Sequence, residues 1–174
     1  MQEVQKYLSI FAKAVIKESQ NRLSKSSKRD TNNLYGSLGY QLDVFKNSFS
    51  LSFYMEEYGA FVDEGVQGKS SSAKAPQSPF RFGTGSATGG RPMSEIMTDW
   101  VKRKGFQWND KKTGRFMSHK AMGFLIAKSI YHKGIAPSMF FTKPFENAFK
   151  NLPDEIIEKF NLDIDELIES SLNT

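Results

Sequence analysis

The two histidines are the first residues to test for chemistry, because imidazole is a common metal ligand and general base. His119 and His132 lie thirteen residues apart in one stretch of helical pattern. On a helix, that separation turns the two rings about 140° around the axis and moves them roughly 3.6 turns along it. They cannot bind one metal ion, and the chain has no cysteine that could supply a thiolate. We therefore expect no metal site.

Paired carboxylates could carry acid–base chemistry, and two adjacent pairs occur, Glu56-Glu57 and Asp63-Glu64. Sequence neighbours point in different directions, so at most one member of each pair can face a given site. Both pairs are typical of a solvated helix edge. The nucleophile motif G-x-S-x-G is absent from the sequence. We therefore expect no catalytic residue and no enzymatic activity.

The glycine-rich stretch FGTGSATGG (residues 82–90) could be taken for a phosphate-binding loop. A nucleotide loop needs a strand before it, a helix after it and, in the P-loop, a lysine directly after the last glycine. Here Arg91-Pro92 follows, and no buried strand pattern precedes. The stretch predicts a flexible loop, and we expect no cofactor.

Basic and aromatic residues alternate in DWVKRKGFQWNDKKTGRFMSHK (residues 99–120), which holds seven Lys/Arg and two Asp. Such interleaving can serve nucleic acid, because cations meet phosphates and rings stack on bases. In the alternative interpretation, Trp100 belongs to a helix core and the lysines are simply solvated. Trp108 fits that alternative less well, because it lies in a loop between charged residues. The candidate cations for such a contact with nucleic acid are Lys102, Arg103, Lys104, Lys111, Lys112 and Arg115, and the pattern alone does not decide whether they face DNA.

The elements that must position these residues follow from apolar periodicity. Helical spacing predicts an amphipathic helix over residues 2–24 and a short turn at Leu34 and Leu38. Alternation over 38–44 and 49–55 predicts a β-hairpin joined by Lys46-Asn47-Ser48, with its serines on a wet face.

The second half of the chain reads as helices around long connections. Residues 66–93 predict a long loop. Ser94 and Ser118 are expected N-caps of two central helices that end at Gly105 and Gly134. The second helix has an expected apolar stripe, and a further helix should start near Pro144. That stripe consists of Met122, Leu125, Ile126 and Ile130.

The order of elements predicts an α+β fold. We expect a small antiparallel sheet built around the hairpin, packed by the N-terminal helix and two central helices, with C-terminal helices. Residues 1–150 would form one domain, and residues 151–174 an acidic, amphipathic helical extension. The charge is uneven, because residues 1–150 carry +11 and residues 151–174 carry −6 of the net +5. Lysines interrupt the N-terminal stretch, and no run is long enough to span a membrane, so we expect no membrane association.

Two phenylalanine pairs suggest contacts with partners. Phe80 and Phe82 lie inside the long loop, where aromatic side chains often order against a neighbour. Phe140 and Phe141 sit between two helices in GIAPSMFFTKPFENAF (residues 134–149). In an extended segment they would point to opposite sides, one into the core and one to a partner. The alternative is that both belong to the core. With Trp108, these four form the expected set of partner contacts.

Four segments, in order, resemble the tail-completion or head–tail joining (neck) proteins of tailed bacteriophages, over roughly residues 4–150. The first is the N-terminal helix followed by NNLYGSLGY, and the second is EEYGAFVDEGVQG before the loop. The third is WVKRKG with AMGFLIAKSIYHKGIAP, and the last is MFFTKPFENAF. Val66 departs from the family's threonine, and Pro144-Phe145 from its proline-alanine.

The resemblance implies a structural virion protein, made in the cytoplasm of the bacterial host. Such a protein forms a ring with copies of itself in the neck or upper tail. It joins the portal or head-completion protein to tail proteins, and genomic DNA passes close by through the lumen. A small basic nucleic-acid-binding domain is the alternative. A nuclease-like enzyme is a third class, which the scarcity of site residues disfavours.

Overall fold

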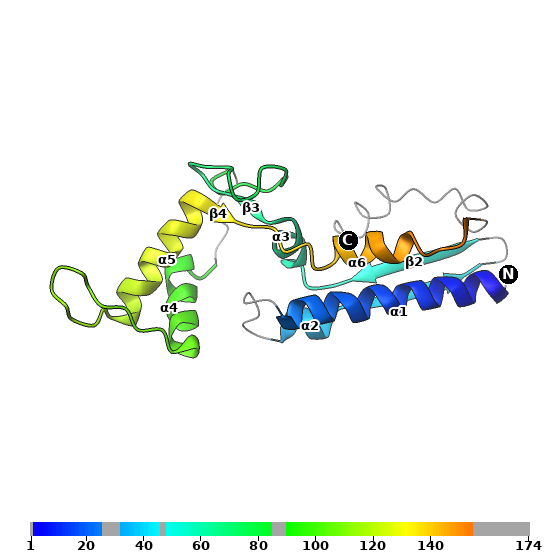
Figure 1. The fold of residues 1–174 in the computed structure, drawn as a ribbon, viewed down its shortest axis with the longest axis horizontal. Coiled ribbons are helices and arrows are strands. Elements are labelled where there is room, and N and C mark those ends of the chain that lie inside the picture. Colours follow the sequence, from blue (N-terminus) through cyan, green and yellow to red (C-terminus); the bar gives the residue numbers. More distant parts are fainter. Residues whose placement is uncertain (1, 26–31, 46–47, 85–89, 155–174) are drawn as a thin grey trace. The chain divides into compact units, whose positions relative to one another are not determined.

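The computed structural model describes residues 2–25, 32–45, 48–84 and 90–154, which form two compact units. The first unit consists of residues 1–63 and 138–174, and the second unit consists of residues 64–137 between them. Helices and a small antiparallel hairpin confirm the predicted α+β class (Figure 1). Residues 1–150, which the sequence predicted as one domain, contribute to both units.

The first unit is organised around α1 (Gln2–Lys25), which confirms the helix expected over residues 2–24. Its buried positions recur every three or four residues, as an amphipathic helix requires. They are Val4, Leu8, Phe11, Ala12, Val15, Ser19 and Leu23. The short α2 (Asn33–Ser37) follows and buries Leu34.

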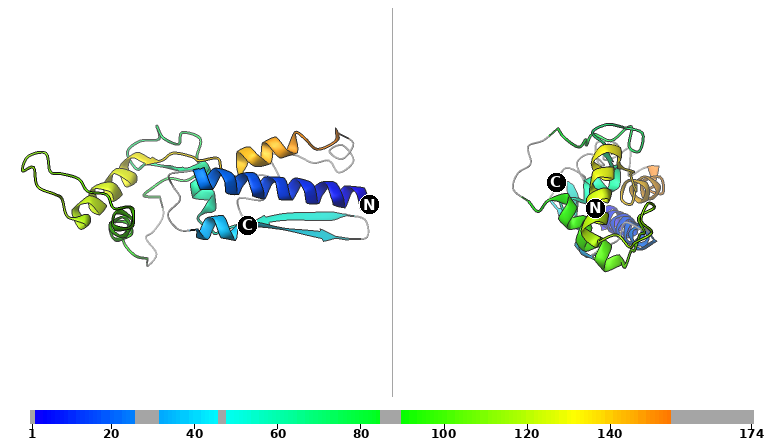
Figure 2. Two further views of the ribbon diagram at one scale, coloured as in Figure 1. Left: turned by 60° about the horizontal axis from the view of Figure 1, so that its bottom comes forward. Right: turned by 90° about the vertical axis from the view of Figure 1, so that its left-hand side faces the viewer.

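The predicted hairpin is confirmed as β1 (Gly39–Val44) and β2 (Phe49–Tyr54), which pair antiparallel with Leu42 opposite Leu51. Phe53 is buried, whereas Ser50 and Ser52 are exposed, so one face is apolar and the other wet. Lys46 and Asn47 of the expected turn lie outside the described residues. Within this unit, α1 packs against both the hairpin and α6 (Thr142–Phe149) (Figure 2), and Phe145 of α6 contacts Phe53 of β2. The two central helices that the sequence assigned to this sheet belong to the second unit.

Phenylalanine rings fill the core of the first unit. Phe11 meets Phe145 edge-to-face with ring centres 5.2 Å apart, and Phe53 meets Phe141 in the same way at 5.4 Å. Both Phe140 and Phe141 are fully buried, with 1% and 0% of their surface exposed. The expectation that one of them reaches a partner is therefore wrong.

The physical reason is that the backbone here is not extended. Met139 has a positive φ of 49°, and Phe141 already has right-handed helical angles as the N-cap residue of α6. Side chains alternate between two sides only in an extended segment. The turn into α6 instead directs both rings into the core.

Asp63, expected at a solvated helix edge, is also fully buried. It lies in α3 (Gly59–Glu64), and its carboxylate accepts hydrogen bonds from the Phe141 amide at 2.7 Å, the Thr142 amide and the Thr142 hydroxyl. The carboxylate thus caps the N-terminus of α6, which is why that helix starts two residues before Pro144. Burial raises the pKa of Asp63, and the hydrogen bonds from Thr142 and Phe141 act in the opposite direction.

The second unit contains α4 (Met93–Lys104) and α5 (His119–Lys133), which pack side by side. Gly123 makes this packing close, because a Cβ at that position would lie 2.3 Å from Thr98 Oγ1. Gly123 and Ala127 face α4, whereas Leu125 is 45% exposed, so the expected apolar stripe of α5 is only partly buried.

The ends of α4 and α5 test four expected capping residues. Gly105 ends α4 in the left-handed conformation with φ 67°, and Gly134 ends α5, both as predicted. Ser118 is confirmed as N-cap, since its hydroxyl accepts from the Ala121 amide. Ser94 is not an N-cap, because α4 begins one residue earlier, after Pro92.

The long loop is anchored at its start. β3 (Val66–Gln67) pairs antiparallel with β4 (Gly134–Ile135), and both two-residue strands are too short to give a periodic signal. The Gln67 amide donates to the Phe80 carbonyl, and the Phe82 amide donates to the Gln67 carbonyl. Residues 85–89 of the glycine-rich stretch and residues 155–174 of the acidic extension lie outside the described residues.

Candidate functional site

The candidate site is the basic-aromatic arm, defined as residues 102–117 from the last turn of α4 to the start of α5. It extends beyond the ends of both helices (Figure 1). The structure brings together here seven of the residues that the sequence singled out, and all seven are exposed. They are Lys102, Arg103, Lys104, Trp108, Lys111, Lys112 and Arg115.

Two backbone features build the base of the arm. Gly105 closes α4, and the three cations of its last turn lie where the negative end of the helix dipole favours them. The Phe106 amide donates to the Val101 carbonyl, and the Phe106 ring lies 5.1 Å from the Trp100 ring. Trp100 is half-buried within its own unit, as the core interpretation of that residue expected.

The tip of the arm is a tight turn held by Asp110. Its carboxylate accepts from the Lys112 amide at 2.8 Å and the Thr113 amide at 2.9 Å, and its own amide donates to the Arg115 carbonyl. Gly114 supplies the left-handed conformation that the turn needs, with φ 68°. Hydrogen bonds from the amides of Thr113 and Lys112 lower the pKa of Asp110.

Aromatic rings line both sides of this turn. Asn109 and Phe116 form an isolated antiparallel β-bridge, and the Met117 amide donates a hydrogen bond to the Trp108 carbonyl. The two sides of the arm therefore run antiparallel. Trp108 is 43% exposed and Phe116 is 70% exposed. The sequence had not ranked Phe106 or Phe116 as contacts, although both lie in the same basic stretch as Trp108.

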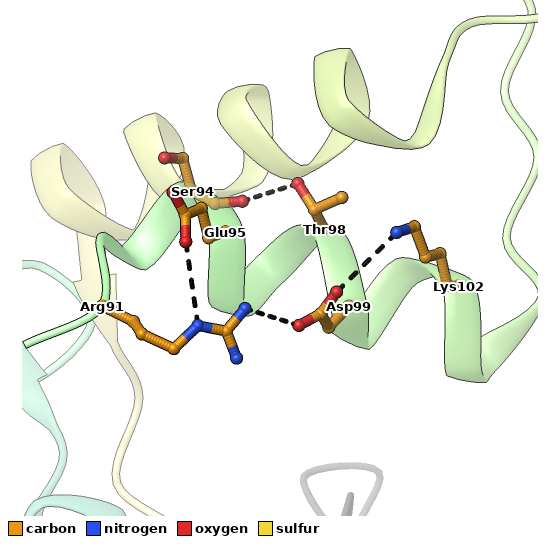
Figure 3. Close-up of polar contacts among 6 residues, drawn as sticks. All are labelled: Arg91, Ser94, Glu95, Thr98, Asp99 and Lys102. Carbon is orange, nitrogen blue, oxygen red and sulfur yellow. Dashed lines mark hydrogen bonds and ion pairs between the residues drawn. The ribbon is translucent and has the colours of Figure 1, made fainter.

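The acidic residues of α4 offset only part of the charge of the arm, because Asp99 pairs both with Arg91 outside the arm and with Lys102 within it. Arg91 Nη2 lies 2.7 Å from Asp99 Oδ2, and Lys102 Nζ lies 3.8 Å from Asp99 Oδ1 (Figure 3). The hydrogen bond from Arg91 lowers the pKa of Asp99. The second unit has thirteen Lys/Arg against four Asp/Glu, a net charge of +9. A strongly positive surface with exposed rings can bind a polyanion or an acidic protein.

The loop phenylalanines are partly engaged by their own unit. Phe80 and Phe82 are half-buried, and the Phe82 ring lies 6.0 Å from the Tyr131 ring. Contact of their remaining exposed surface with another subunit stays a prediction.

Sequence reasoning missed an apolar groove between α4 and α5. It has a volume of about 410 Å³. Phe124, one of the residues that line it, is 57% exposed. The spacing of Phe124, Lys128 and Tyr131 on α5 was the only available signal, and it is also compatible with a buried stripe. We call it the α4–α5 groove. It is lined by Met93, Ser94, Phe124, Ala127, Lys128 and Tyr131.

The described residues offer little for metal or membrane chemistry. Among them, there is no group of three or more His, Cys, Asp or Glu placed to hold a metal ion. No helix in the described ranges has the length and apolar character to cross a bilayer. Comparison with protein-family models, curated proteins and solved structures produced no match to the chain.

Proposed function

We propose that the chain is a structural subunit of a tailed-phage particle. It forms a ring in the neck or upper tail, joins the portal or head-completion assembly to the tail, and surrounds the DNA channel. In this role it makes contacts and catalyses no reaction. The four ordered sequence segments that resemble neck proteins suggest the class.

The observation that carries the proposal is the outward display of aromatic and basic side chains in the second unit. Phe106, Trp108 and Phe116 are all exposed in the arm, and +9 of net charge is concentrated in the same unit. Exposed aromatic side chains rimmed by charge are typical of protein interaction sites. The fully buried carboxylate of Asp63 is occupied by capping α6, which supports a structural role for it.

Light scattering coupled to size exclusion tests the ring with the purified full chain. We expect particles of one defined multiple of the subunit mass, which dissociate on dilution. In the variant Trp108→Ser/Phe116→Ser, the proportion of these particles should fall. Tyr54→Ser is the matched control, because Tyr54 is 55% exposed on β2 in the first unit. A wild-type protein that stays monomeric alone and with portal and tail proteins would contradict the proposal.

The second candidate function is nucleic-acid binding by a monomer, favoured by the cations at the tip of the arm. It predicts tight binding of labelled DNA that weakens steeply between low and moderate salt. The variant Lys111→Glu/Lys112→Glu/Arg115→Glu should abolish that binding. Binding with no salt dependence, or unchanged in the variant, would exclude this candidate. Turnover of a substrate by the purified protein would contradict both.

A further inference from the structure

The α4–α5 groove has the form of a site for an amphipathic helix. Phe124, Ala127, Lys128 and Tyr131 are spaced at i, i+3, i+4 and i+7, so they form one stripe along α5. Met93 and Ser94 at the start of α4 complete the other wall. A stripe of this spacing beside a second helix is the usual receptor for the apolar face of a third.

Cations surround the groove. Lys128 lines it, and Lys69 Nζ lies 5.6 Å from the centre of the Tyr131 ring at one end. Lys120 is exposed one turn before Phe124 at the other end. None of the six lining residues is acidic. The occupant that fits this groove is therefore apolar on one face and negatively charged on its flanks.

The chain itself contains such a segment. Residues 155–174 read EIIEKFNLDIDELIESSLNT, with six Asp/Glu against one lysine. Its apolar residues recur at helical spacing, as Ile157, Phe160, Ile164, Leu167 and Ile168.

We propose that the α4–α5 groove of one copy receives the acidic segment 155–174 of a neighbouring copy. Apolar side chains of the segment would cover Phe124, and its carboxylates would meet Lys120 and Lys128. The inference rests on the proposed ring, because a groove on one copy and a segment from the next form a head-to-tail contact that can close a cycle.

A charge-exchange experiment with the full chain tests the contact. The groove variant is Lys120→Glu/Lys128→Glu, and the segment variant is Asp163→Lys/Asp165→Lys/Glu166→Lys. Each alone should raise the concentration at which particles form by at least about tenfold. The combined variant should recover part of the loss, since opposite charges face each other again. The control, Lys6→Glu/Lys13→Glu, changes two exposed lysines of α1 in the first unit and should have no effect.

A peptide titration separates this inference from the ring itself. A fluorescent peptide of residues 155–174 is added to the segment variant, whose grooves are then unoccupied. Saturable binding that is lost when Phe124→Ser is added supports the inference. Absence of peptide binding overturns it, as does binding that Phe124→Ser leaves unchanged.

The ring proposal survives if the wild type still forms particles while the groove and segment variants assemble normally. In that outcome the groove serves a different partner and the inference is wrong. If the wild type never assembles, the ring proposal fails, and the peptide titration still decides whether the groove takes the segment. A monomer that binds its own segment and rejects the peptide would contradict the contact between copies.

Discussion

The two units differ in whether they bury aromatic side chains in their cores. In the first unit, Phe11, Phe53, Phe140, Phe141, Phe145 and Phe149 are buried and contact one another. In the described part of the second unit, no aromatic side chain is fully buried, and the buried apolar residues are smaller ones such as Val101, Met122 and Ala127. The core of the first unit is therefore built from packed rings, whereas the core of the second unit is built from smaller apolar side chains.

This difference shows where each unit obtains its stability. Buried phenylalanine rings each contribute several kcal/mol, because their truncation leaves a cavity. The second unit depends instead on the close approach of α4 and α5 at Gly123 and on capped helix ends and turns. A unit stabilised in this way does not need its aromatic side chains in the core, so they can remain exposed for contact with partners. The predictions below test this contrast.

The largest effect is expected for Phe141→Ala. It removes a fully buried ring that lies 5.4 Å from Phe53 and 5.8 Å from Phe145, so the free energy of unfolding should fall by about 3–5 kcal/mol. Phe116→Ala is the matched change in the second unit and should alter the free energy of unfolding by less than about 0.5 kcal/mol. Denaturant unfolding followed by far-UV circular dichroism measures both. Equal losses in the two variants would refute the contrast.

The second-largest effect is expected for Asp63→Ala, which should lower the free energy of unfolding by about 2–4 kcal/mol. The change leaves the buried amides at the start of α6 without their acceptor. Asp63→Asn keeps one acceptor oxygen and should lose less. Glu57→Ala removes an exposed carboxylate near α3 and serves as the control in the same assay. A loss for Asp63→Ala no larger than that of the control would show that the cap contributes nothing.

Gly123→Ala should cost the second unit about 1–3 kcal/mol, because the new Cβ would overlap the backbone amide and hydroxyl of Thr98. Both tryptophans of the chain, Trp100 and Trp108, belong to this unit, so tryptophan fluorescence follows its unfolding selectively. Gly36→Ala in α2 has open space around it and is the control. An unchanged fluorescence transition in Gly123→Ala would mean that the helix contact is not tight.

The smallest effect is expected for the turn at the tip of the arm, whose stability should decrease at acid pH. Since the pKa of Asp110 is lowered in the folded chain, its stabilisation is complete above the unfolded-state value of about 3.9 and is lost as pH falls through the folded value. The amide resonances of Lys112 and Thr113 should therefore titrate with a midpoint below that value. Asp110→Asn should abolish this titration. A midpoint at or above the unfolded value would contradict the proposed hydrogen bonds.

Much of the fold could be predicted from local patterns. The apolar spacing of α1 and the alternation of β1 and β2 depend only on residues within each segment. The same holds for the caps at Gly105 and Ser118. The burial of Asp63 could not be predicted, because its hydrogen-bond partners lie 78 and 79 residues away along the chain. The two-residue strands β3 and β4 carry no period at all.

The sequence likewise located one part of the candidate region, the arm, and missed another, the α4–α5 groove. Trp108 lies in a polar loop between Lys104 and Asp110, so the sequence could locate the arm. The α4–α5 groove depends on which face of α5 meets α4, and that choice is made by the absence of a side chain at Gly123. Periodicity alone could not distinguish a stripe that faces α4 from one that faces solvent.

The interrupted order of the first unit has a consequence for synthesis on the ribosome. Its N-terminal part, up to Asp63, is translated before the 74 residues of the second unit, and Phe141 and Phe145 emerge only afterwards. At typical rates of chain elongation, that interval lasts roughly 4–15 s. During it, Phe11 and Phe53 can contact each other but lack Phe145 and Phe141, so the nascent chain exposes apolar surface. A chaperone that shields nascent chains should therefore raise the yield of folded protein.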